Sequence, residues 1–220
     1  MKSLCGIGLD IVRERAEPKD YQRELLFITG RRDELAAIIN LASHHLRDTT
    51  ACKSMKDQFE HWNLYLHRSY VASELYLPAL KHSSLDSETT TSLKVTCVES
   101  LANTVEAFLG LENVTRFASQ SWAAVHRALS SALLLGILNE PVKSQRVRTL
   151  LDRLIAVMSD LSLTLDPSEV SAPIIRSISA LRHLNSQEVG KGALGHNLDE
   201  SSPYALMDKI LWGTQRMSPI

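Results

Sequence analysis

The sequence predicts an all-α protein, a single bundle or array of about seven helices with a short C-terminal docking helix. Apolar residues recur every three or four positions along most of the chain, and turn or cap residues close these periodic segments. The alternation of apolar and polar residues that is typical of strands is almost absent. With 220 residues, 44% of them hydrophobic, one α-helical domain over 1–220 is long enough to bury a core.

The first predicted helix follows an N-terminal segment, 1–30, that we expect to be loosely structured. Within that segment, 21–29 has a pattern that fits neither a helix nor a strand clearly. A helix is predicted over 31–47 because apolar residues lie at helical spacing there, namely Leu35, Ile38, Ile39, Ala42 and Leu46. Asp33 and Glu34 lie near its start, where negative charge stabilises a helix.

Two longer helices are predicted in the middle of the chain. The first covers 55–77, and one stripe of it holds Phe59, Trp62, Leu66, Tyr70 and Leu77. Ser54 is placed to cap its start, and Pro78 is placed to end or kink it. A polar connector over 81–88 then leads to a second helix over 91–111, with apolar residues mostly at every fourth position.

The second half of the chain has the densest helical pattern. Ser121 is placed to cap the start of a helix, and the segment ending in Pro141 is expected to end that helix. Its part over 128–138 is apolar nearly all round, which predicts a central helix that is buried on most sides. Helices over 146–161 and 173–184 are expected to pack around it.

The last part of the chain is expected to be a linker followed by a docking segment. The linker, 185–203, holds glycines among polar residues. The segment 204–213 is apolar and follows Pro203, and we expect it to dock on the bundle.

Charge and cysteine content exclude several classes of function. The formal net charge is −1 and basic residues form no cluster, which excludes direct nucleic-acid binding by this chain. Cys5, Cys52 and Cys97 are far apart, so they predict neither a disulfide framework nor a zinc site. The longest uncharged apolar run, 128–138, is too short to span a membrane. A soluble intracellular protein without a membrane partner is expected.

No residue set predicts catalysis, a metal or a cofactor. The eight histidines show no metal-binding spacing, since His44 and His45 are adjacent and face different sides of a helix. The start of a dinucleotide fingerprint at Gly6 lacks its third glycine, because Ile11 stands at that position. A nucleophile elbow is absent from the sequence.

Five side chains are the candidate ligand-binding residues, because each combines an apolar body with a polar tip. Such groups often line small-molecule pockets. They are Trp62, Tyr65, Tyr70, Trp122 and His126. Packing in a hydrophobic core is the alternative interpretation of the same residues.

Five longer stretches carry a resemblance to a known family: EHWNLYLHRSYVASELYLPAL, SWAAVHRALSSALLLGILNEP, RVRTLLDRLIAVMSDL, SEVSAPIIRSISALRHL and SPYALMDKILWG. Together they cover roughly residues 50–212. They resemble the C-terminal regulatory (middle-homology-type) region of fungal binuclear zinc-cluster transcription factors. The resemblance implies an α-helical regulatory domain that acts in the nucleus, attached to a DNA-binding zinc cluster. The three scattered cysteines here cannot supply that cluster.

Two functions of different classes are therefore predicted. The first is a non-catalytic regulatory or interaction domain, lacking the zinc cluster, that controls activation through a protein partner, self-association or a small-molecule effector. The alternative is a stand-alone, cytoplasmic, all-α biosynthetic enzyme of secondary metabolism. It would be cyclase-like, with catalysis based on the shape of an apolar pocket and on donors such as Tyr65, Tyr70 and His126.

Overall fold

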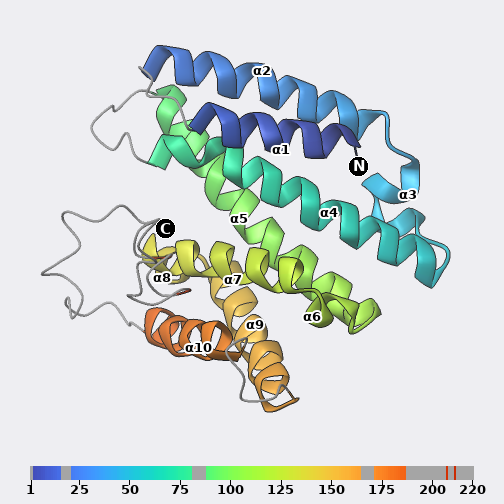
Figure 1. The fold of residues 1–220 in the computed structure, drawn as a ribbon, viewed down its shortest axis with the longest axis vertical. Coiled ribbons are helices and arrows are strands. Elements are labelled where there is room, and N and C mark those ends of the chain that lie inside the picture. The colour runs from blue at the N-terminus through green and yellow to red at the C-terminus, as the bar shows by residue number, and fades with distance from the viewer. Residues whose placement is uncertain are drawn as a thin grey trace, which may run out of the picture. The chain divides into compact units, whose positions relative to one another are not determined.

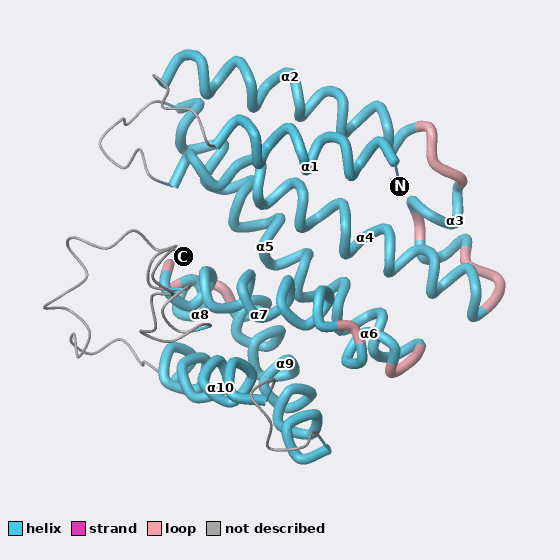
Figure 2. Tube along the Cα trace, viewed as in Figure 1, coloured by secondary structure: helices cyan, strands magenta, loops and turns pink. Residues whose placement is uncertain are grey.

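The described part of the chain is helical, and its helices are joined by short loops (Figures 1 and 2). The computed structural model describes residues 2–15, 21–80, 88–164, 171–186, Met207 and Leu211. Seven of the described helices have 14 or more residues, which confirms the all-α class. The chain divides into two compact units, Met1–Ala118 and Ser119–Ile220, where the sequence predicted one domain.

The first unit is built around the long pair α4 and α5. Both α1 and α2 contact α4 and each other, and α4 packs along α5 (Figure 1). Short α3 and the 3-10 turn η1 precede α4, and the 3-10 turn η2 follows it. The bounds are α1 (Lys2–Arg15), α2 (Tyr21–Asn40), α3 (His44–Arg47), η1 (Thr49–Ala51), α4 (Met55–Tyr76), η2 (Leu77–Leu80) and α5 (Glu88–Val114).

The expectation of a loose segment over 1–30 is wrong, because α1 and the first half of α2 lie there. Leu4, Ile7 and Ile11 of α1 are buried at helical spacing, so this helix has an apolar face of its own. Asp10 of α1 is half-buried and pairs with Arg31 of α2 at 3.0 Å. The charge therefore joins the two helices.

The predicted helix over 31–47 is divided in the structure. Residues 31–40 belong to α2, which ends at Asn40, and α3 starts at His44. The ambiguous segment 21–29 is the helical first half of α2. The break matters because it changes the direction of the chain beside α4.

The two middle helices confirm the sequence prediction closely. Helix α4 starts after Ser54, whose hydroxyl accepts a hydrogen bond from the Asp57 backbone N–H at 3.1 Å. The Asp57 carboxylate accepts one from the Ser54 backbone N–H at 3.0 Å, which completes a capping box. The α-helix ends at Tyr76, and η2, which contains Pro78, follows. Helix α5 includes all of the predicted range 91–111.

The second unit contains α7 (Trp122–Ile137), α8 (Glu140–Lys143), α9 (Gln145–Thr164) and α10 (Ser171–Ser186), and α6 (Phe117–Gln120) holds the boundary between the units. Helix α10 contacts α7 and α9, and α8 contacts both of its neighbours. Every residue of α7 from Ala128 to Gly136 is buried, in keeping with the all-round apolar pattern predicted over 128–138. Gly136 lets α10 approach closely, since a Cβ there would lie 2.9 Å from Cδ1 of Leu184.

Two details of the second unit differ from the sequence expectation or extend it. Ser121 is the N-cap residue of α7, as predicted, but its side chain makes no capping hydrogen bond. Of the predicted docking segment, Met207 and Leu211 are described and both are buried. The guanidinium of Arg176 in α10 donates to the Leu211 carbonyl at 2.8 Å. The predicted linker from 187 onward lies outside the described residues.

Candidate functional site

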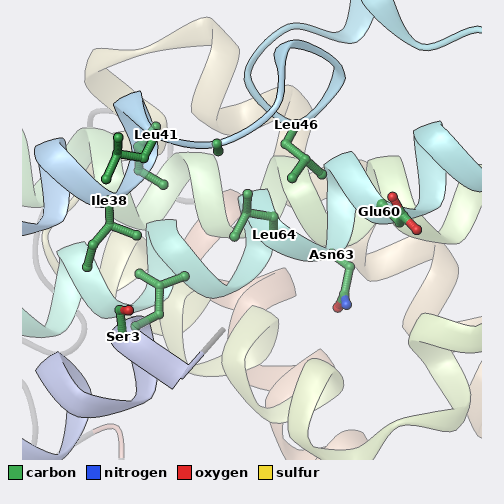
Figure 3. A pocket seen from close by; sticks show the side chains of 10 residues that line it. Ser3, Ile38, Leu41, Leu46, Glu60, Asn63 and Leu64 are labelled. Atoms are coloured by element: carbon green, nitrogen blue, oxygen red, sulfur yellow. The ribbon is translucent and has the colours of Figure 1, made fainter.

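A pocket of about 500 Å³ lies in the first unit where α1, α2, α3 and α4 meet. We call it the helix-junction pocket. Seven of its ten lining residues are apolar: Leu4, Ile38, Ile39, Leu41, Ala42, Leu46 and Leu64. The polar lining residues are Ser3, Glu60 and Asn63. Figure 3 shows the labelled apolar side chains between Ser3 at one edge and Glu60 and Asn63 at the other.

The pocket forms at the break between α2 and α3, where apolar residues from both sides of the break face α4. Ile38 and Ile39 end the apolar face of α2, and Leu46 returns from α3. Leu64 faces them from α4. Leu41 is 88% exposed and belongs to the rim, so the pocket is open to a ligand from solvent. A concave apolar surface with a few polar groups is the usual form of a small-molecule site.

Hydrogen bonds hold the polar edge of the pocket in place. The Glu60 carboxylate lies 3.2 Å from Nε2 of His45 and 3.8 Å from Nζ of Lys56. Nδ1 of His61 donates to the His45 carbonyl at 3.0 Å. Burial lowers the pKa of His61, which favours the neutral imidazole. Cys52 also contacts the His45 carbonyl, with Sγ at 3.4 Å. The contacts of His45 with Glu60 and with His61 fasten α3 to α4 beside the pocket.

None of the five aromatic and histidine candidates lines the helix-junction pocket. The Trp62 and Tyr65 rings lie 5.9 Å apart on α4, and the Trp122 and His126 rings lie 6.1 Å apart on α7. Tyr65 lines a second groove, formed by α2, α4 and α5. The ligand-binding role of all five stays a prediction.

Tyr65 and Tyr70, which the enzyme alternative would use, leave α4 in different directions. They are five positions apart, which separates their side chains by about 140° around a helix. Tyr65 lines the second groove and Tyr70 lines neither it nor the helix-junction pocket. The structure thus does not bring the two phenols together at either site.

Sequence reasoning missed the helix-junction pocket because it treated Leu35 to Leu46 as one continuous helical stripe. A signal for the break was present. Asn40 is a residue type that ends helices, and Ser43 is one that starts them. The apolar residues on the two sides of this break are the ones that converge on the pocket.

The described residues contain no group of three His, Cys, Asp or Glu side chains that could hold a metal ion. Burial raises the pKa of the Cys97 thiol to about 12, and its Sγ lies 3.8 Å from the Ser73 carbonyl. This thiol is therefore protonated and inert at neutral pH. Among the described helices, none is both long enough and apolar enough to cross a membrane.

No protein-family model, curated protein sequence or solved structure matches this chain. The resemblance to fungal zinc-cluster regulators therefore rests on the sequence stretches alone.

Proposed function

We propose that the chain is a non-catalytic regulatory domain of the fungal binuclear zinc-cluster type, which controls transcription by binding a small effector or a protein partner. The helix-junction pocket is the observation that supports this proposal most directly. Its volume of about 500 Å³ suits a small molecule or one or two side chains of a partner. The family-like sequence stretches support the regulatory part.

The lining chemistry favours an occupant with an apolar body and one hydrogen-bonding group. Leu46 and Leu64 offer apolar contact, whereas the Asn63 amide can donate or accept a hydrogen bond at the edge. The Glu60 carboxylate is already held by His45 and Lys56. A neutral donor, such as a hydroxyl or an amide, suits this edge better than an acid, which the Glu60 charge repels.

The pocket suits regulation because its walls come from separate helices. An occupant contacts α1, α2, α3 and α4 at once, and α3 is a short helix beside a break in the chain. A ligand changes a conformational equilibrium only if it binds one state better than another. Binding here favours the arrangement in which α3 and α2 stay closed on α4, and that arrangement is the signal that we propose.

A reporter assay tests the proposal. The full chain is fused to a heterologous DNA-binding domain, and transcription from a matching promoter is measured across growth media. We expect activation or repression relative to the DNA-binding domain alone, with a response to at least one medium. Equal reporter output for the fusion and the bare DNA-binding domain in every medium would rule the regulatory function out, provided that the fusion is present in the nucleus at equal amounts.

A further inference from the structure

The second groove in the first unit has a volume of about 350 Å³ and a lining quite unlike that of the helix-junction pocket. We call it the arginine groove, because Arg32 of α2 and Arg68 of α4 line it. None of its lining residues is acidic. Ala36 and Ala72 give it an apolar middle, and α5 contributes Asn103. The groove therefore combines positive charge with a small apolar surface.

The two arginines stand toward opposite ends of the groove. Helices α2 and α4 run in opposite directions (Figure 1). Arg32 acts electrostatically on Tyr76, which places these two residues near each other. Arg68 precedes Tyr76 by eight positions on α4, which corresponds to about 12 Å along a helix. Arg68 thus lies at the other end of the groove, which Asn40 of α2 and Tyr65 also line.

Arg68 is the stronger anchor for an anion. Its guanidinium carbon lies over the Tyr65 ring, 4.6 Å from the ring centroid, in a cation–π contact that helps to hold the group in place. No carboxylate of the described residues pairs with it. Arg32, in contrast, is bound by its neighbour Asp33 at 3.0 Å in an exposed pair. Such pairs contribute little and exchange readily with other anions.

Neutral donors surround the positive charge. Ser69 is 4% exposed and Tyr76 is 5% exposed, and both line the groove. Burial raises the pKa of Tyr76, so its phenol keeps its proton and remains a hydrogen-bond donor. The amides of Asn40 and Asn103 add further donors. Donors of this kind, together with a guanidinium, match the two oxygens of a carboxylate.

We propose that the arginine groove binds a small organic carboxylate, with the acid group on Arg68 and an apolar body over Ala36 and Ala72. The volume suits a single small molecule and is too small for a helix of a partner. A planar guanidinium held against an aromatic ring presents its N–H edge to a carboxylate in bidentate fashion. This site shares only Ile39 with the helix-junction pocket and does not depend on the function proposed for that pocket.

Titration of the full chain followed by NMR tests this proposal. Hydrocinnamate is the probe, and its neutral amide, hydrocinnamamide, is the matched control. The resonances followed are the side-chain Nε–H of Arg68 and the backbone amide of Ser69. Because a hydrogen bond to a charged group is lost in the amide, we expect it to bind at least about tenfold more weakly than the acid. Equal binding of the two probes overturns the proposal, and so does tighter binding of phenyl phosphate than of hydrocinnamate.

Substitutions identify the anchor. Arg68→Gln removes the charge and is expected to weaken hydrocinnamate binding by about tenfold or more, and Arg68→Lys restores part of the loss. Arg13→Gln is the matched control, because Arg13 lies outside the groove and is 77% exposed. It should bind like the wild type. Circular dichroism establishes that each variant is folded. Unchanged affinity in folded Arg68→Gln, or shifts confined to Leu46 and Leu64 of the helix-junction pocket, contradicts the assignment.

Discussion

The indole ring of Trp62 occupies the space that a side chain at Gly110 would need. A Cβ at Gly110 would lie closer to Cδ2 of Trp62 than real Cβ contacts come. The three nearest atoms all belong to the ring, which is rigid. Helices α4 and α5 therefore approach each other at a point where only glycine fits, and Trp62 serves there as a packing residue.

Replacement of Gly110 with alanine is expected to destabilise the protein. Alanine gains about 1 kcal/mol in a helix over glycine, but overpacking against a rigid ring costs about 1–3 kcal/mol. The difference between these two effects predicts that the free energy of unfolding in urea falls by about 1 kcal/mol, within a range of about 0–2 kcal/mol. Gly30→Ala in α2 is the control, because nothing lies within 4 Å of a Cβ there, and it should stabilise. Equal gains in the free energy of unfolding for both variants would mean that the α4–α5 contact is looser than described.

The capping box at the start of α4 gives a second prediction. Ser54→Ala removes the hydroxyl that accepts from Asp57 N–H, and should lower the free energy of unfolding by about 1 kcal/mol. Ser43→Ala is the matched control, because Ser43 starts α3 without a side-chain capping bond. Its effect should stay within about 0.5 kcal/mol. Chemical denaturation of both variants measures the difference, and equal losses would contradict the assigned cap.

The buried imidazole of His61 makes stability depend on pH. Burial lowers its pKa below the ordinary 6.5, with Arg68 and His45 acting in the same direction and the hydrogen bond to His45 and the charge of Asp48 opposing it. The unfolded chain thus takes up a proton at higher pH than the folded one. The stabilisation is complete above about pH 6.5 and is lost as pH falls through the range below it.

Substitution tests whether His61 causes this dependence of stability on pH. Between about pH 7 and about pH 5, His61→Gln should lose less stability than the wild type, because glutamine does not titrate. His44→Gln is the control, since His44 is exposed. Thermal unfolding at several pH values measures both. If the His61 variant shows the full wild-type loss on acidification, another group is the cause.

Much of the fold could be predicted because local signals and apolar stripes agree in most segments. Ser54 and Pro78 mark the ends of the α4 region, and the all-round apolar pattern of α7 correctly indicated its burial. Helix α1 was missed because the whole segment 1–30 was expected to be loosely structured. Its Asp10 pairs with a residue of α2. Its partner, Arg31, is a tertiary contact that periodicity does not reveal.

The candidate site was less predictable, because a pocket is a space between elements. Ile38 and Leu46 were recognised as apolar stripe residues, but a stripe does not show that the chain turns between them. Trp62 has the chemistry of a ligand-binding residue, yet it packs on Gly110, 48 positions away. Such a contact depends on how α4 and α5 cross. Arg68 was not singled out at all, because its significance comes from neighbours on α2 and α5.

Filling the helix-junction pocket tests the central claim most directly. Ala42→Phe places a ring in the pocket, whereas Ala37→Phe adds the same ring at an exposed position of α2 outside it. In the reporter fusion, the account predicts that Ala42→Phe changes output or its response to the medium by roughly threefold or more, and that Ala37→Phe behaves like the wild type. Wild-type output from a folded Ala42→Phe fusion in every medium would contradict it.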